Sequence, residues 1–254
     1  MSIYATGDTH ANWLRFSKES FYEQKDMTRN DFVIQLGDFG IWNDSKSERY
    51  HLNWLQNMPF TICFVDGNHE NFDRLEGGEF PEVDFHGGRA HKIRDNIYHL
   101  ERGYVYELQG KKFFAFGGAS SHDIQDGIID RKDYKSELEF RNAILKAGDM
   151  RLMCRVNHVS WWARENPSEE EYQRGLNSLD RYNWDVDYVI THCPPSSVSS
   201  MIIGAHSPDK EEQYFEQLLY KELKFNYWLF GHMHVNRNFP PNFVGLYEQI
   251  VRIL

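Results

Sequence analysis

Residues 32–40 read Phe-Val-Ile-Gln-Leu-Gly-Asp-Phe-Gly and place a mainly apolar run directly before a glycine–aspartate turn. Asp8 lies thirty positions before Asp38 and follows residues 2–6 in the same way. Asn68 lies thirty positions after Asp38 and follows residues 60–65. Short apolar runs bounded by turn residues predict buried strands. Because about 30 residues is the length of one β-α-β unit, two consecutive units predict neighbouring parallel strands joined by right-handed crossovers.

The rest of the chain extends this pattern and adds shorter strands. Two more apolar runs, 186–191 and 227–230, end in histidine-bearing turns and predict further buried strands. Helices are predicted at 12–24, 45–57 and 136–147, and after start signals at Ser168 and Ser207. Short strands typical of antiparallel pairing are predicted at 97–100, 104–108 and 112–116, and a last strand at 244–254. We therefore expect an α/β fold with one domain over residues 1–254, in which residues 120–166 form an insertion or a lid.

Composition and charge restrict the class of protein. The 254 residues carry a formal net charge of -10, which disfavours a protein that follows long nucleic acid by neutralising its phosphates. No apolar stretch approaches the roughly 20 residues of a membrane span, and the N-terminus leads into the first strand without a leader pattern. Three well-separated cysteines cannot all pair within the chain and suggest free thiols. We therefore expect a cytoplasmic protein with no membrane partner.

The polar residues after the five apolar runs are the candidate site, because ligands of an open α/β sheet bind at the carboxyl ends of its strands. The side chains expected to converge there are Asp8, His10, Asp38, Asn68, His69, His192, His232 and His234. Each motif alone is ordinary, since a lone histidine is more often packed or solvated and Gly-Asp is usually a turn or a helix cap. Five motifs at five strand ends instead indicate a metal site. Carboxylate, imidazole and amide ligands suit Mn, Fe, Zn, Co or Ni, and seven of these residues, with His69 set aside, suffice for two metals.

The order of the motifs also resembles a known family. Asp-x-His, Gly-Asp, Gly-Asn-His-Glu, His and Gly-His-x-His, over residues 7–234, resemble the signature of the calcineurin-like metallophosphoesterases. The resemblance implies a four-layer α/β/β/α sandwich of two mixed sheets flanked by helices, and a binuclear metal-dependent phosphoester hydrolase. It implies that one metal is held by Asp8, His10 and His234 and the other by Asn68, His192 and His232, with Asp38 bridging them.

The chemistry that the resemblance implies involves His69 and a metal-bridging hydroxide. His69 would not be a ligand but would face the phosphoryl group and stabilise or protonate the leaving oxygen. The hydroxide would attack phosphorus in line, because binding to two metals lowers the pKa of water toward about 7. Mn²⁺ is favoured among the candidate metals. Two dications exceed the charge of the Asp8 and Asp38 carboxylates, so the site attracts a small phosphate ester although the chain carries -10.

Three positions differ from the protein serine/threonine phosphatases of this superfamily. Ile41 stands where those enzymes have the aspartate that pairs with the catalytic histidine, and Trp42 and Asp66 stand where they have arginines. The chain is therefore not expected in that branch, and a phosphodiester or another small phosphate ester is the expected substrate. A non-catalytic metal-binding scaffold on the same fold and a nuclease are the alternatives.

The loop after the predicted strand 112–116 holds further candidate residues. His122 and Asp123 are placed to line the pocket, with Arg131 as the partner of an oxyanion. A solvated loop without a role in the site explains these residues equally well.

Overall fold

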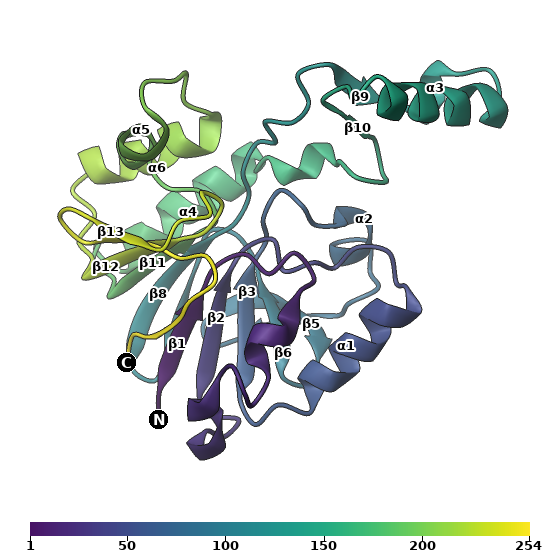
Figure 1. The fold of residues 1–254 in the computed structure, drawn as a ribbon. Coiled ribbons are helices and arrows are strands. Elements are labelled where there is room, and N and C mark those ends of the chain that lie inside the picture. Colours follow the sequence, from purple (N-terminus) through teal and green to yellow (C-terminus); the bar gives the residue numbers. More distant parts are fainter.

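The computed structural model describes residues 1–254 and contains two large sheets that pack face to face (Figure 1). The first sheet has the order β15 (Ile250–Arg252), β1 (Ile3–Thr6), β2 (Phe32–Leu36), β3 (Thr61–Val65), β6 (Ile97–Leu100), β5 (Gly88–Arg94), β4 (Glu82–Phe85). The second has the order β13 (Arg237–Phe239), β14 (Phe243–Gly245), β12 (Tyr227–Phe230), β11 (Tyr188–Thr191), β8 (Lys111–Phe116), β7 (Tyr104–Leu108). The central strands of each sheet pair in parallel and the outer strands pair antiparallel, so both sheets are mixed.

Alternating side chains explain why the two sheets form a sandwich. In β2, Ile34 and Leu36 pack in the core between the sheets, whereas Val33 packs in the core under the helices of the first sheet. In β12, Leu229 faces the first sheet and Trp228 faces the helices of the second. Both faces of each central strand are therefore buried, as expected for parallel strands covered on two sides. The predicted four-layer α/β/β/α arrangement is confirmed.

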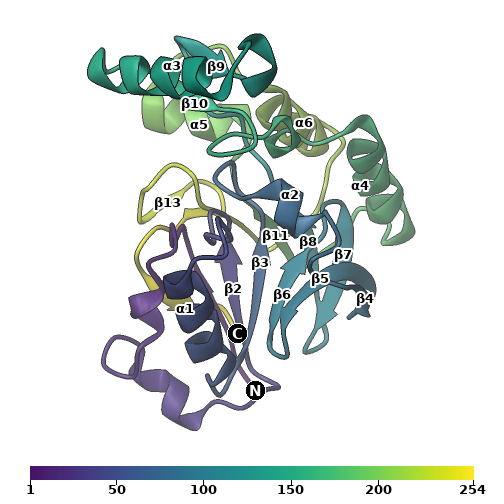
Figure 2. The same ribbon diagram turned by 90° about the vertical axis from the view of Figure 1, so that its right-hand side faces the viewer.

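Helices cover the outer face of each sheet (Figure 2). Leu52 and Leu55 of α1 lie in the core of the first sheet, and Leu179 and Leu218 of two other helices lie in that of the second. The α-helices are α1 (Lys46–Gln56), α2 (Phe72–Leu75), α3 (Glu137–Asp149), α4 (Glu169–Arg181), α5 (Ser196–Ile203) and α6 (Lys210–Tyr220). The predicted capping box of α4 is present, with Ser168 accepting from the Glu171 N–H and Glu171 accepting from the Ser168 N–H.

The segment 120–166 carries a separate small sheet. Strands β9 (Gly127–Ile129) and β10 (Cys154–Val156) pair in parallel, and α3 connects them. In both ribbon views this part of the chain stands at the end of the sandwich toward which the central strands point. Its position places the segment next to the polar loops that follow those strands.

Two local predictions are wrong for identifiable reasons. Residues 12–24 do not form one helix but contain the 3-10 helices η1 (Trp13–Phe16) and η2 (Tyr22–Asp26), because the Gln24 amide donates to backbone carbonyls of the connecting turn. The antiparallel pairing predicted for strands 97–100, 104–108 and 112–116 is present, with β6 on β5 in the first sheet and β7 on β8 in the second. The helix expected from Ser207 begins at Lys210, where Asp209 supplies its capping box.

Candidate metal centre

The five central strands deliver their polar residues to one edge of the sandwich, which we call the five-strand edge. The residues there are Asp8 and His10 after β1, Asp38 after β2, Asn68 and His69 after β3, His192 after β11, and His232 and His234 after β12. Two glycines allow these loops to interleave. A Cβ at Gly37 would overlap the imidazole of His192, and a Cβ at Gly67 would overlap the carboxylate of Asp38. The convergence predicted from the strand ends is therefore present.

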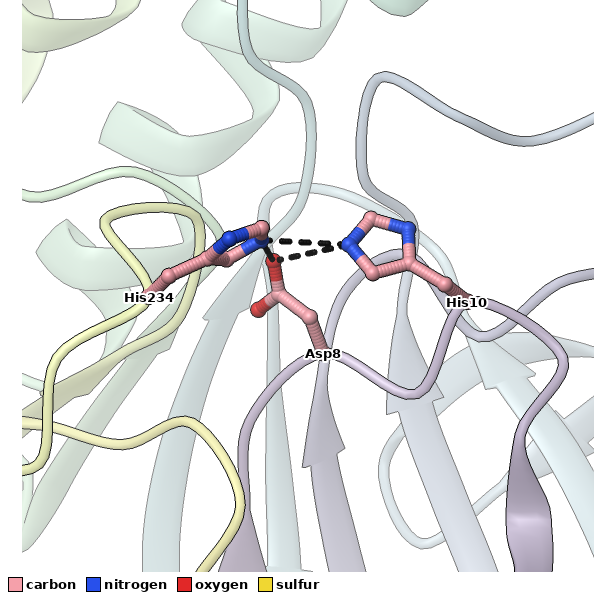
Figure 3. Close-up of side chains that lie close together, drawn as sticks. All are labelled: Asp8, His10 and His234. Carbon is pink, nitrogen blue, oxygen red and sulfur yellow. Dashed lines mark hydrogen bonds and ion pairs between the residues drawn. The ribbon is translucent and has the colours of Figure 1, made fainter.

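Asp8, His10 and His234 form the first compact group (Figure 3). Asp8 Oδ2 lies 3.0 Å from His234 Nε2 and 3.8 Å from His10 Nε2, and the two Nε2 atoms are 3.1 Å apart. The His232 backbone N–H donates to Asp8 Oδ1 at 2.9 Å, so the orientation of the carboxylate is fixed. Asp8 Oδ2 is buried and accepts no hydrogen bond of ordinary geometry. A buried carboxylate oxygen between two imidazoles and without a donor fits a divalent cation.

Asp38 lies between this group and a second one. The ligand atoms of Asp8, Asp38 and His192 lie within 4.8 Å of one another. Asp38 Oδ2 is 3.7 Å from His10 Nδ1 and 3.6 Å from His192 Nε2, so it is close to one imidazole of each group. Asn68 Oδ1 is 3.2 Å from His192 Nε2. The second group is therefore built from carboxylate, imidazole and amide oxygen, a donor set that divalent metals accept.

Two further histidines are oriented by their surroundings. His192 Nδ1 donates to the Leu36 carbonyl oxygen at 2.7 Å, so Nε2 points toward Asn68 and Asp38. Burial lowers the pKa of His232 well below its ordinary value, which keeps that ring neutral. The His232 ring packs against His192 with centroids 4.9 Å apart, although it belongs to neither compact group.

His69 lies beside the two groups without joining them. Its backbone N–H donates to Asp38 Oδ1 at 2.8 Å, and its ring centroid lies 5.6 Å from that of His10. Burial lowers the pKa of the His69 imidazole, against the opposing effect of the Asp38 charge. The His69 side chain lines a cavity of about 410 Å³ together with His10 and Trp42. This position suits a residue that meets a substrate rather than a metal.

The three positions at which the chain differs from the protein phosphatases have structural roles here. Ile41 is fully buried in the core of the first sheet. Trp42 Nε1 donates to the His69 carbonyl oxygen at 2.7 Å. Asp66 is buried, and although burial opposes its ionisation, the Arg102 guanidinium beside it holds the pKa of Asp66 well below its usual range. None of these three side chains supplies a positive charge to the site.

Glu70 is a functional position that the strand-end argument missed. Its buried carboxylate accepts the backbone N–H groups of Phe39 at 2.5 Å and Ile41 at 2.9 Å, and it also accepts that of Gly40. These bonds fix the loop directly after Asp38. The signal was available, since Glu70 closes the Gly-Asn-His-Glu motif, but the motif does not show which groups the carboxylate binds.

The further candidates of the 120–166 segment differ in how close they lie to the five-strand edge and to the cavity beside His69. His122 lies near the five-strand edge, with its ring centroid 6.1 Å from that of His232, and its Nε2 is 3.1 Å from Asp209 Oδ2. Asp123 forms an ion pair with Arg155, which lines the cavity beside His69. Arg131 is exposed, pairs with Glu137 and does not line this cavity, so its predicted place at the pocket is wrong. Arg155 is the arginine that sequence reasoning missed.

A comparison with protein families identifies the family of this chain. The model of the calcineurin-like phosphoesterase family matches residues 1–236. One similar solved structure is a phosphopantetheinyl hydrolase from Mycobacterium tuberculosis, with 14% identity, coverage of 100% of this chain and 95% of that chain, and a TM-score of 0.47. A comparison with curated protein sequences finds no match. No helix combines the length and apolar character that a bilayer crossing requires.

The fold and the grouped carboxylates and imidazoles define a metal-dependent hydrolase of phosphate esters. Since the family model covers nearly the whole chain, the chain belongs to the calcineurin-like phosphoesterase family, whose members use divalent metals.

Proposed function

We propose that this chain hydrolyses small phosphate esters, including phosphodiesters, with two divalent metals, for which Mn²⁺ is favoured. In this proposal one metal is held by Asp8, His10 and His234, the other by Asn68, His192 and His232, and Asp38 bridges them. The observation that carries the proposal is the position of Asp38 Oδ2, within 3.7 Å of an imidazole nitrogen from each set. His232 belongs to the second set through its ring contact with His192, with centroids 4.9 Å apart.

The proposed chemistry divides between the metals and His69. When bound, two divalent metals would supply positive charge for the phosphoryl oxygens and would lower the pKa of water, so that an in-line nucleophile is available near neutral pH. His69 would stabilise or protonate the leaving oxygen, since its imidazole lines the cavity and its backbone is fixed on Asp38. His192 is oriented by its Nδ1–H bond to Leu36, so its other nitrogen is already directed at the site.

The size and charge of the molecule support a small substrate in the cytoplasm. A cavity of about 410 Å³ beside His69 has the size of a small-molecule site. The net charge of -10 disfavours long nucleic acid. The three cysteines are free thiols, which supports a reducing compartment.

The test is hydrolysis of bis-p-nitrophenyl phosphate by the Mn²⁺-loaded chain, followed by a panel that includes p-nitrophenyl phosphate and single-stranded DNA. We expect turnover of the small esters and its loss in His69→Ala, while His51→Ala, which changes a histidine outside the site, keeps wild-type activity. No turnover with any divalent metal would refute the proposal. Turnover of DNA in preference to the small esters would favour the nuclease.

A further inference from the structure

The cavity beside His69 is lined by residues from two parts of the chain. His10 and His69 come from the loops of the five-strand edge, and the insertion contributes Arg155, Val159, Ser160 and Trp162. A ligand in contact with His69 therefore also meets residues of the insertion. The side chains of the insertion thus decide which esters fit the site.

Arg155 is held in place by contacts that leave part of its guanidinium free. Its Nε donates to Asp123 at 2.7 Å, its Nη2 donates to the same carboxylate, and its Nη1 donates to the Ser160 carbonyl oxygen at 3.2 Å. These contacts engage three of the five N–H groups of the guanidinium, so two remain for a ligand. The side chain is 23% exposed, which leaves it reachable from the cavity.

Arg155 is also the one arginine or lysine side chain that lines this cavity. Arg102, which lies near the five-strand edge, is buried and bound to Asp66, and Arg164 is bound to Glu76 and Glu171. Neither lines the cavity that contains His69. A bound anion near His69 therefore finds its guanidinium partner in Arg155.

Trp42 gives the same cavity an aromatic surface. Its indole is 38% exposed, although its Nε1 is already engaged with the His69 carbonyl oxygen. Trp162 also belongs to the lining but is buried, with its Nε1 donating to Asp73 at 2.7 Å. Because the Trp42 ring nitrogen already has a partner, its indole offers the cavity mainly apolar surface. A planar ring packs well on such a surface.

We infer that Arg155 binds an anionic oxygen of the substrate and that Trp42 packs against an aromatic or heteroaromatic leaving group. This inference rests on the proposed function and names its substrate class, an aryl or heteroaryl phosphate ester. Asp123 positions Arg155 and does not touch the substrate.

The first test measures binding of inorganic phosphate to the Mn²⁺-loaded chain by calorimetry. Loss of a charged hydrogen bond predicts about 10- to 100-fold weaker binding for Arg155→Met. Arg155→Lys, which keeps the charge, should lose less. Asp123→Asn keeps the guanidinium but weakens the ion pair that positions it, so it should also lose less than Arg155→Met. Arg131→Met, which removes a remote charge from the same segment, should stay within about 3-fold of wild type.

Two results would overturn the assignment of Arg155. One is wild-type phosphate binding by Arg155→Met and Arg155→Lys. The other is a loss in Arg131→Met as large as that in Arg155→Met, because phosphate would then respond only to the charge of the whole segment. Failure of the proposed function is recognised separately, since the wild-type chain would then hydrolyse no ester at all.

The second test compares phenyl phosphate with glycerol 2-phosphate. We expect Trp42→Leu to lower the ratio of their kcat/KM values by about 3- to 10-fold, the size of one aromatic contact. Trp184→Leu, at the end of α4 and outside the cavity, should leave the ratio unchanged. An unchanged ratio in Trp42→Leu would exclude the aromatic subsite.

Discussion

The five-strand edge and the insertion meet at one cavity but are built by different means. Asp8, Asp38 and His192 are almost fully buried and are fixed by backbone groups from neighbouring strands. In the insertion, Arg155 of the three-residue strand β10 and Asp123 of the loop before β9 are half-buried and hold each other. The first region has the rigidity that metal chemistry requires. The insertion is held by few contacts, so its residues are suited to distinguish one substrate from another.

The largest effect is expected at the five-strand edge. Asp38→Asn removes the charge between the two ligand groups, so we expect the kcat of bis-p-nitrophenyl phosphate hydrolysis to fall about 1000-fold or more. Steady-state kinetics at saturating Mn²⁺ measures this loss. Asp44→Asn, which changes an exposed carboxylate paired with Arg49, serves as the matched control. Activity of Asp38→Asn within tenfold of wild type would show that this carboxylate does not bridge metals.

The second largest effect is expected at Glu70, which anchors the loop after Asp38 at the five-strand edge. Glu70→Ala leaves the buried N–H groups of Phe39, Gly40 and Ile41 without their acceptor. We expect the free energy of unfolding to fall by about 4 kcal/mol, measured by urea denaturation of the metal-free chain. Glu137→Ala, on the exposed surface of α3, should change it by less than 1 kcal/mol, as is typical of surface sites. Equal stabilities of the two variants would contradict the anchoring role of Glu70.

Glu165 holds the two ends of the insertion together and should make stability depend on pH. It accepts the backbone N–H of Ser121 at 2.8 Å and its hydroxyl at 2.7 Å, but burial raises the pKa of Glu165 from 4.5 to about 7. The folded chain thus holds this proton more tightly than the unfolded chain does. Its contribution to stability is present below about pH 4.5 and is lost as the pH rises through about 7.

Glu165→Gln has no such proton to lose. The difference in free energy of unfolding between Glu165→Gln and wild type should therefore rise by about 2–3 kcal/mol from pH 5 to pH 8. Denaturation curves of both proteins at the two pH values give this difference. A difference that does not change with pH would show that Glu165 is ionised throughout.

The smallest effect is expected on the outer surface of the insertion. Arg141 and Glu137 of α3 form an exposed ion pair at 2.9 Å. We expect Arg141→Met to change the free energy of unfolding by less than about 0.5 kcal/mol and to leave kcat/KM unchanged. A large loss of activity would mean that the exposed face of α3 contributes to the site.

Local patterns in the sequence were sufficient to predict the strands and the polar residues that follow them. Strands β2, β6, β7 and β12 have the predicted bounds, because their apolar runs are limited by turn residues. Asp8 and His234 were predicted to converge because parallel strands end at the same edge, and Asp8 Oδ2 lies 3.0 Å from His234 Nε2. The four-layer arrangement required the family resemblance in addition, since alternation alone does not show how two sheets are stacked.

Tertiary contacts decide what local patterns could not predict. Arg155 reaches the cavity through β9 and β10, which are too short to have a recognisable period. The turn between η1 and η2 is held by the side chain of Gln24, which replaces helical hydrogen bonds. Arg131 was chosen for its charge and its position in the segment, but Glu137 binds it on the surface.

The measurement that tests the central claim most directly is Mn²⁺ binding to the metal-stripped chain. Calorimetry gives the number of bound ions, and electron paramagnetic resonance shows whether their spins are coupled. If Asp38 bridges two ligand sets, wild type binds two Mn²⁺ ions whose spins are coupled, as expected for metals about 3.5–4 Å apart. Asp38→Asn should lose that coupling. A single Mn²⁺ per chain, or two uncoupled ions in the wild-type protein, would contradict the account.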